Sequence, residues 1–336
     1  MQRKKILFIC GSHNQTTMMH QISMHLEDHD LWFTPFYVDG VLGHLQRRGL
    51  LDFTIAGHKH RAAALAYMQQ YDLQIDDQGM SRQYDLVVTC SDLIVPKNIR
   101  NTPIVLVQEG MTDPENVFFY LSKYLGLPRY LASTSTTGLS DMYDRFCVAS
   151  PGYRDLFVRK GIDSGKVIVT GIPNYDNCVE YGNRPFPHKD YVLVATSDAR
   201  ETFKYENRKA FLYDAVDIAC GRQLIVKLHP NEQIARAVDE IRRYAPDAIV
   251  YPTGDVNAMI AHCDVLVTKY STVVYVGLAL NKEVHSAFPI DELRTLTPLQ
   301  NGGRSAVNIA AVCLESIDAA DRSGRTIHLP HYRISV

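Results

Sequence analysis

The stretch Gln223–Glu232, QLIVKLHPNE, joins a short apolar run directly to a histidine, a proline and a polar turn. Alternate side chains of a β-strand point to the same face, so Lys227 and His229 are predicted to project together near the strand's end. Pro230 cannot continue the hydrogen-bond ladder, and Asn231 is an acceptable N-cap for a following helix. A cation and an imidazole beside helix-terminal N–H groups commonly hold a phosphate. The alternative is a solvated strand end without a ligand.

Runs of this kind recur along the chain, each followed by a polar turn and a stretch with helical spacing. Short β-branched runs that alternate with helices predict parallel strands buried on both faces. The first series contains KKILFIC, WFTPFYV, YDLVVTC, PIVLVQE, DRFCVAS and KVIVTG. The second series contains YVLVATS, QLIVKLH, AIVYP, DVLVT and KEVHSAF. Two such series predict an α/β chain with two Rossmann-like, doubly wound parallel-sheet domains.

The join between the two series lies in residues 171–190, which are rich in Pro, Gly, Asn and charge and have no sustained apolar period. The predicted domains are therefore residues 1–180 and 181–336. Doubly wound sheets bind ligands beyond the carboxyl ends of their strands, so the predicted site is a cleft that both domains face. Residues 295–325 contain a loop and an apolar stretch compatible with a helix.

Composition narrows the class of protein. The 336 residues are 46% hydrophobic and 21% charged, with Lys+Arg 35 against Asp+Glu 37, which is typical of a soluble globular protein and predicts no nucleic-acid partner. The apolar run before Gly11 is too short for a signal sequence or a membrane span. The 7 cysteines are scattered and never spaced C-x-x-C, which indicates a reducing cytoplasm and neither a disulfide framework nor a zinc site.

A second polar turn follows another predicted strand in His262–Leu280, HCDVLVTKYSTVVYVGLAL. DVLVT is the strand, KYS the turn, and the apolar remainder a helix whose first turn contains Ser271 and Thr272. Such a pair can cap its helix, or it can give hydroxyl groups and unpaired N–H groups to a phosphate. Capping is the usual explanation for an isolated Ser-Thr pair. Its occurrence downstream of Lys-x-His-Pro favours phosphate binding.

KLHP and DVLVTKYSTVVYVGLALNKEVH together resemble the HP and S motifs of bacterial GT-B transferases that make capsules and teichoic acids. These are the CDP-glycerol glycerophosphotransferase, polysialyltransferase and capsular Kdo-transferase groups, with a more distant likeness to UDP-N-acetylglucosamine 2-epimerases. PIVLVQEG, YDRFCVASPGYRDLFVRKGI and KVIVTGIPNYDN resemble the N-terminal domain of those proteins. The likeness covers roughly residues 85–290. It implies the GT-B fold and a nucleotide-activated donor, CMP-, CDP- or UDP-linked, as substrate.

Carried over by position, the resemblance implies that His229 and Pro230 hold the donor's phosphates and that Ser271 and Thr272 support them. Relatives usually have an acidic residue in this turn, as in T-D-Y-S, whereas this chain has Lys269 before Tyr270. The turn is therefore more cationic, which suits a phosphate. Lys227, Lys269 and Tyr270 are included in the predicted donor site.

The turn after YVLVATS contributes two further candidates for the donor site. Arg200 would fork onto a diphosphate, and Thr196 or Ser197 would donate a hydrogen bond from the same turn. The alternative is a surface arginine paired with Glu201 or Glu206.

Glu109 follows the predicted strand PIVLVQ in the first domain and is the predicted general base. Transfer to a hydroxyl needs a base within hydrogen-bond reach, and a carboxylate with restricted solvation suits that role. Many relatives have H-G where this chain has E-G. The alternative is that Glu109 only accepts hydrogen bonds from backbone N–H groups of the Met111–Asn116 loop. His13, in the glycine turn after the first strand, is the alternative base.

The predicted activity is transfer of a glycosyl or glycerophosphoryl group from a nucleotide donor to a hydroxyl of a cell-surface glycan or glycolipid precursor. A UDP-N-acetylglucosamine 2-epimerase and a non-catalytic nucleotide-sugar-binding protein are the alternatives. No histidine spacing has the pattern of a metal site, so no obligatory metal or other cofactor is predicted. Location is predicted to be cytoplasmic. The aromatic and basic segment LSKYLGLPRYLASTSTTGLSDMYDRF either touches a membrane-borne acceptor or packs its Tyr and Leu onto the sheet; oligomeric state is left open.

Overall fold

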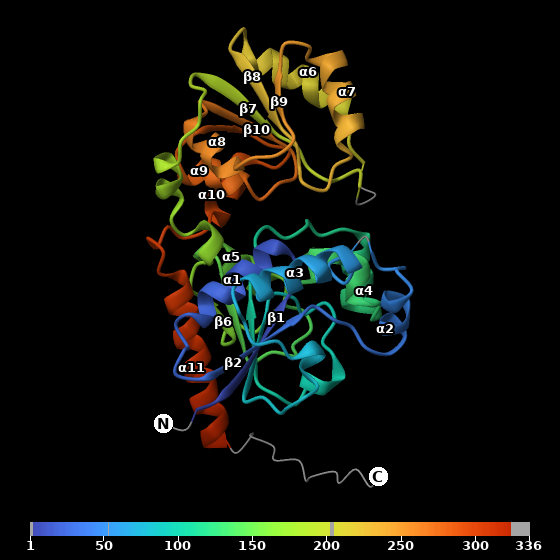
Figure 1. Cartoon of the computed structure of the whole chain (residues 1–336), viewed down its shortest axis with the longest axis vertical. Helices are drawn as coiled ribbons and strands as arrows, with labels where there is room; N and C mark the ends of the chain where they lie inside the picture. The colour runs from blue at the N-terminus through green and yellow to red at the C-terminus, as the bar shows by residue number, and fades with distance from the viewer. Residues whose placement is uncertain (1–2, 53, 202–204, 324–336) are drawn as a thin grey trace. The chain divides into compact units, whose positions relative to one another are not determined.

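A computed structural model describes residues 3–52, 54–201 and 205–323. Within these ranges the chain forms two parallel β-sheets flanked by helices and divides into two compact units (Figure 1). The first unit takes the chain up to Val148, Arg154–Pro173 and the segment from Arg304. The second unit takes Ala149–Tyr153 and Asn174–Gly303.

The first sheet has the strand order β2-β1-β3-β4-β5-β6, with every neighbouring pair parallel. Its strands are β1 Lys5–Cys10, β2 Asp30–Pro35, β3 Leu86–Thr89, β4 Ile104–Val107, β5 Arg145–Val148 and β6 Val167–Val169. The helices in this part of the chain are α1 His13–Ser23, α2 Gly40–Arg47, α3 His58–Gln70, α4 Val117–Leu125 and α5 Pro151–Arg159. Short 3-10 helices lie at Asp77–Gly79, Lys97–Ile99 and Arg129–Thr136.

The second sheet has the strand order β11-β10-β7-β8-β9 and is also parallel throughout. Its strands are β7 Tyr191–Ala195, β8 Gln223–Lys227, β9 Ile249–Tyr251, β10 Val265–Thr268 and β11 Glu283–His285. The helices are α6 Arg208–Ala219, α7 Ile234–Tyr244, α8 Val256–His262, α9 Val274–Ala279 and α10 Ile290–Leu296. Short 3-10 helices lie at Pro173–Tyr175 and Cys178–Asn183.

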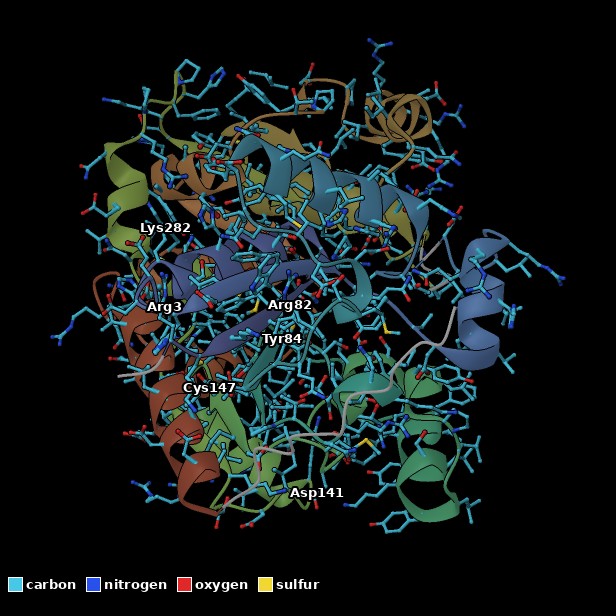
Figure 2. The ribbon with its side chains drawn as sticks, turned by 60° about the horizontal axis from the view of Figure 1, so that its bottom comes forward. Arg3, Arg82, Tyr84, Asp141, Cys147 and Lys282 are labelled. Carbon is cyan, nitrogen blue, oxygen red and sulfur yellow. The ribbon has the colours of Figure 1, made fainter. Side chains whose placement is uncertain are left out.

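Each predicted strand is present, and the central strands are buried on both faces. Residues of β3, β4, β7 and β10 are buried without exception, as the uninterrupted β-branched runs require when helices cover both sides of a sheet. Cys147 on β5 is fully buried (Figure 2), and burial raises the pKa of its thiol to about 12. This cysteine therefore serves as a small apolar core residue.

The last described helix, α11 (Ser305–Ser323), belongs to the first unit. It packs against β3, β4, β5 and α1, and Figure 1 shows it in red beside the first sheet. Ile309, Cys313 and Ile317 are among its buried residues. The structure thus divides the chain differently from the predicted ranges 1–180 and 181–336, because an apolar helix face from the end of the chain covers the first sheet.

Trp32 on the edge strand β2 is the single tryptophan of the sequence. The Arg82 guanidinium lies 3.4 Å from the centroid of its ring, a cation–π contact. Arg82 and its neighbour Tyr84 are labelled together in Figure 2. Tyr84 donates a 2.5 Å hydrogen bond to Asp76, and Arg82 lies 3.6 Å from the same carboxylate. Because Trp32 lies in the first unit, its fluorescence reports the unfolding of that unit alone.

Candidate functional site

The strand order of each sheet places a topological switch point beside its first strand. In the second sheet the chain runs from β7 outward through β8 to β9, then crosses to β10 on the other side of β7. In the first sheet it runs from β1 to β2, then crosses to β3. Ligands of doubly wound sheets bind where the order reverses, outside the carboxyl ends of the strands. The candidate ligand-binding turns are therefore those after β7, β8 and β10 in the second sheet and those after β1, β3 and β4 in the first.

The carboxyl ends of β10, β7 and β8 are in register in the second unit. Thr268 is opposite Ala195, and Ala195 is opposite Lys227. The Thr268 hydroxyl donates to the Ala195 carbonyl at 2.9 Å, and the Thr196 N–H donates to the Lys227 carbonyl at 3.1 Å. The three polar turns singled out in the sequence therefore begin at the same level on neighbouring strands.

Lys227 ends β8 with only 6% of its surface exposed. Its Nζ donates a 2.6 Å hydrogen bond to the carbonyl of Leu228, and burial lowers the pKa of its ammonium group, with Glu232 acting in the opposite sense. The strand stops before His229, so these two residues do not lie on one continuous strand face. Lys227 thus directs its charge into the protein in this structure.

His229 is half-buried at the turn after β8. Its Nδ1 lies 3.3 Å from the N–H of Asn231, which donates to it, and 3.8 Å from the Asp198 carboxylate. Because Nδ1 accepts, the neutral ring carries its hydrogen on Nε2. Among the described residues, none forms a hydrogen bond with Nε2. His229 therefore offers one N–H donor to a ligand, and Pro230 beside it is exposed.

Glu232 turns inward instead of opening the next helix. The helix α7 begins at Ile234 with Gln233 as its N-cap, whereas Asn231 was predicted as the cap. Asn231 instead donates a 3.0 Å hydrogen bond from its amide to Asp198. The reason is the turn in which the Glu232 N–H donates to the His229 carbonyl, which carries the Glu232 side chain into the protein.

The buried Glu232 carboxylate is the centre of a hydrogen-bond network that the sequence did not reveal. It accepts from the Thr196 hydroxyl, from the His229 N–H at 3.0 Å and from Arg208 at 2.5 Å. Arg208 also donates at 2.5 Å to Glu206, which accepts from Ser197 at 3.2 Å. The network fixes the backbone of His229 to the turn after β7. The sequence does contain a sign of this network, the acidic residue Glu232 two positions after His-Pro. We expected a helix to begin at this point.

Arg200 pairs with residues other than those considered from the sequence. Its Nη1 donates to Glu240 of α7 at 2.8 Å, and its Nη2 lies 3.8 Å from Glu232. The hydrogen bond to Glu240 is the main reason that the pKa of the guanidinium is raised. Arg200 is thus committed to an ion pair in this structure. Ser197 is likewise buried and bonded to Glu206.

Ser271 and Thr272 lie half-buried in the turn after β10, before the helix α9. That helix begins at Val274, two residues later than predicted, so neither hydroxyl caps it. Thr272 Oγ1 accepts a 2.9 Å hydrogen bond from the Tyr175 hydroxyl, which leaves its own hydrogen able to donate elsewhere.

The two preceding residues, Lys269 and Tyr270, are held by aromatic contacts. The Lys269 Nζ lies 5.1 Å from the centre of the Phe211 ring. The exposed Tyr270 packs edge-on against Phe288, with ring centres 5.5 Å apart. Tyr270 is therefore exposed beside the turn, whereas Lys269 is half-buried.

Glu109 follows β4 in the first unit and is half-buried. Its two carboxylate oxygens accept hydrogen bonds of 2.6 Å each, one from the Ser12 hydroxyl and one from the Gln15 side-chain amide. Both donors come from the start of α1, where Ser12 is also the N-cap. Among the described residues, the hydrogen bonds of the Glu109 carboxylate are thus with α1 and its N-cap and not with the Met111–Asn116 loop.

Gly11 makes the contact between Gln15 and Glu109 sterically possible. A Cβ at Gly11 would lie 2.0 Å from Oε1 of Gln15. The first strand, its glycine turn and α1 together hold the carboxylate between neutral donors.

His13, the alternative base, is the first residue of α1 and is exposed. Its ring lies edge-on to Tyr67 with centroids 5.9 Å apart. Among the described residues, no hydrogen bond or ion pair joins His13 to Glu109. Among the described residues, no cluster of three or more His, Cys, Asp or Glu side chains is arranged to hold a metal ion. The described helices also include none with the length and apolar character needed to span a bilayer.

Neither a known family model nor a curated protein matches the sequence, but solved structures match nearly the whole chain. UDP-GlcNAc 2-epimerase from Neisseria meningitidis, solved with UDP-GlcNAc, is 12% identical, with a TM-score of 0.58 over 93% of this chain and 100% of that one. MnaA from S. aureus, solved with UDP, is 12% identical, with a TM-score of 0.55 over 97% and 99%. The wall teichoic acid polymerase TagF is 13% identical, with a TM-score of 0.45 over 95% of this chain and 83% of that one. The chain has the two-domain GT-B fold, which confirms the predicted fold class.

Proposed function

We propose that this protein is a GT-B transferase that moves a glycosyl or glycerophosphoryl group from a nucleotide-activated donor to an acceptor hydroxyl. The observation that carries the proposal is the collection of polar turns at the switch point of the second sheet, after β7, β8 and β10. Phosphate ligands bind at such points in doubly wound sheets.

The donor's phosphates are assigned to His229, Ser271 and Thr272. His229 would donate from Nε2, because its Nδ1 is already occupied by the Asn231 N–H. Thr272 would donate its hydroxyl hydrogen, because its oxygen accepts from Tyr175. Lys227 and Arg200 take supporting roles in this scheme, since their described contacts are internal. Hydrogen bonds from these donors would stabilise negative charge on the departing nucleotide phosphate.

Glu109 is assigned as the general base. In the transfer step, the acceptor oxygen would form a bond to the transferred carbon or phosphorus as the bond to the nucleotide phosphate breaks. Glu109 would take the acceptor's proton. Its two hydrogen-bond donors, Ser12 and Gln15, are neutral, and the carboxylate is half-buried, which leaves part of it accessible to an acceptor hydroxyl.

A UDP-N-acetylglucosamine 2-epimerase is the second candidate, because UDP-GlcNAc 2-epimerase from Neisseria meningitidis and a second solved UDP-N-acetylglucosamine 2-epimerase share the fold at TM-scores of 0.58 and 0.54. Incubation with UDP-N-acetylglucosamine alone separates the two activities. An epimerase would convert this compound without any acceptor, whereas a transferase would leave it unchanged or would hydrolyse it slowly. A protein that binds nucleotides and consumes no donor with any acceptor tested would be a binding protein instead.

The first experiment is a thermal-shift screen over CMP, CDP, UDP and their sugar or glycerol conjugates. Ligands that bind the folded state raise the melting temperature, so the screen identifies the nucleotide. Calorimetry with that nucleotide then compares the wild type with His229→Ala, and His285→Ala serves as a control at an exposed histidine of the same unit. We expect about a tenfold loss of affinity for His229→Ala only, as for one hydrogen bond to a charged group. Equal affinity in all three proteins would place the phosphates elsewhere.

A further inference from the structure

The first unit contains a cavity of about 580 Å³ that is separate from the Glu109 cluster. Its walls come from the turn before α2, the segment after β3, the end of α4 with the following 3-10 helix, and the end of α5. Neither Glu109 nor His13 lines it. Its charged lining residues are Asp39, Arg100, Lys123, Arg129 and Lys160. Four cations against one carboxylate make the cavity electropositive.

Lys160 is the most buried of these cations, with 3% of its surface exposed. Its Nζ donates a 3.0 Å hydrogen bond to the Ser135 carbonyl and lies 5.6 Å and 5.9 Å from the ring centres of Phe119 and Phe157. Within the described part of the chain, no carboxylate lies at ion-pair distance from it. Burial lowers the pKa of this ammonium group, and the more distant carboxylates of Glu115 and Asp113 act in the opposite sense. A buried cation without a paired anion is costly, and an anionic ligand would offset that cost.

Two further polar groups in the cavity wall have unused hydrogen-bonding capacity. The Ser122 hydroxyl is buried and has no hydrogen-bond partner among the described residues, and the same is true of the Arg129 Nε. Arg129 Nη2 donates at 3.3 Å to the Asp92 carbonyl, which fixes the guanidinium at the wall. Buried polar atoms are nearly always paired in native proteins, so these two point to a polar ligand.

The outer face of α4, beside the cavity, exposes large apolar and aromatic side chains. The exposed fractions are 70% for Val117, 51% for Phe118, 49% for Tyr120, 69% for Tyr124 and 70% for Leu125. The sequence left open whether the segment from Leu121 packs its Tyr and Leu onto the sheet; in the structure Tyr124 and Leu125 are exposed, whereas Tyr143 is buried. α4 ends at Gly126, whose φ of 71° is left-handed, and Gly126 and Lys123 both line the cavity.

We propose that this surface binds an anionic phospholipid, with its phosphate in the cavity and its hydrocarbon against α4. Lys160, Arg129 and the Ser122 hydroxyl would contact the phosphate oxygens. Tyr124 and Leu125 would enter the membrane interface, where aromatic and apolar side chains beside cations are favoured. The proposal rests on charge complementarity within the cavity and on the adjoining apolar face. It is independent of the nucleotide site in the second unit.

Vesicle flotation of the full-length protein tests this proposal. Vesicles of phosphatidylcholine alone are compared with vesicles that also contain phosphatidylglycerol. We expect flotation with the anionic vesicles and much less with the neutral ones. Lys160→Met should weaken binding about fivefold, as expected for one basic group at an anionic surface. Lys59→Met removes an equal charge from an exposed lysine outside the cavity and should change binding little.

A second pair of variants tests the apolar contact. Leu125→Ser should weaken binding to anionic vesicles about tenfold, as expected when a leucine no longer enters the membrane. Leu50→Ser, at a leucine that is 58% exposed in the same unit and lies outside the cavity, is the matched control. Leu125→Ser and Leu50→Ser change exposed residues and should fold normally. They therefore test the proposal even if Lys160→Met is unstable.

Three outcomes would overturn the proposal. One is equal flotation with neutral and anionic vesicles. Another is equal weakening by Lys59→Met and Lys160→Met, which would indicate a diffuse charge effect. The third is calorimetric binding of inorganic phosphate that Lys160→Met abolishes, in a protein that does not float with any vesicle. That result would assign the cavity to a soluble phosphate compound.

Discussion

Two glutamates stand at the carboxyl ends of the two sheets, and their surroundings are opposite. Glu109, in the first unit, is half-buried, and among the described residues it accepts hydrogen bonds only from the neutral side chains of Ser12 and Gln15. Glu232, in the second unit, has a side chain with 0% exposure and accepts from Arg208, from a hydroxyl and from a backbone N–H.

The difference shows how position alone does not decide what a carboxylate does. A buried carboxylate bonded to an arginine serves to hold structure, here the backbone of His229. A half-buried carboxylate between neutral donors remains partly accessible to a substrate hydroxyl. The first arrangement suits a positioning residue and the second suits a general base.

The largest expected effect is on stability, from Glu232→Gln. The change leaves Arg208 buried with one carboxylate instead of two, and breaking a buried pair costs about 3 kcal/mol. Denaturant unfolding should be followed by far-UV circular dichroism, which reports both units, and by Trp32 fluorescence, which reports the first. We expect the second unit's transition to move and the Trp32 transition to stay. Glu283→Gln, at an exposed glutamate, is the control and should change stability by under about 0.5 kcal/mol.

Glu109→Gln should have the converse effect, on turnover and not on stability. Loss of a general base lowers the rate of the chemical step by about a hundredfold or more. The free energy of unfolding should change by under about 1 kcal/mol, because a glutamine oxygen can still accept one of the two hydrogen bonds. Steady-state kinetics with the nucleotide donor identified in the screen provide the measurement. Full turnover in this variant, with Glu115→Gln as the matched control, would remove Glu109 from the mechanism.

A smaller effect is expected from Gly11→Ala, which sharpens the comparison at the Glu109 site. The added Cβ displaces the Gln15 side chain, so Glu109 loses one of its two neutral donors. We expect turnover to fall about fivefold, equivalent to one neutral hydrogen bond, with nucleotide affinity unchanged. Gln15→Leu should reproduce the effect without altering the turn. A normal rate in both variants would show that Gln15 does not contribute.

The smallest expected effect is a pH dependence of the free energy of unfolding that arises from Lys227, near Glu232. Burial lowers the pKa of this ammonium group below the ordinary value of 10.5, so the unfolded chain binds more protons than the folded one between the two values. Stability therefore rises with pH in that window, by the linkage relation. In Lys227→Met this contribution is absent. Unfolding free energies measured at a series of pH values should show the wild type gaining on the variant as pH approaches 10.5; a constant difference would contradict this.

The strands were predictable because each buried parallel strand is a compact run of β-branched residues. The switch points and the polar turns followed from strand order. Sequence reasoning placed Glu109 and His229 at strand ends, but it did not identify their partners. Ser12 and Gln15 follow β1, whereas Glu109 follows β4, and β3 lies between these two strands in the sheet, so the contacting residues are far apart in the sequence. Such long-range contacts leave no local pattern.

The second unit shows the same limit in its ion pairs. Arg200 was predicted to bind a diphosphate, with a pair to its sequence neighbours Glu201 or Glu206 as the alternative, and its hydrogen bond in the structure is to Glu240 on α7. The start of α7 was misplaced because Glu232 is drawn inward by Arg208, 24 residues earlier. The sequence also did not predict that α11 belongs to the first unit, because an apolar helix face can pack against either sheet.

The return of α11 to the first sheet also sets the order in which the chain can fold during its synthesis. All strands of the second sheet precede α11, so that sheet can form once Asn174–Gly303 has been made. The first sheet is made earlier, yet the surface of β3, β4 and β5 that α11 covers must wait for Ser305–Ser323. The unit that begins the chain is thus the last to complete its core, and a nascent chain carries that apolar surface uncovered while the second unit folds.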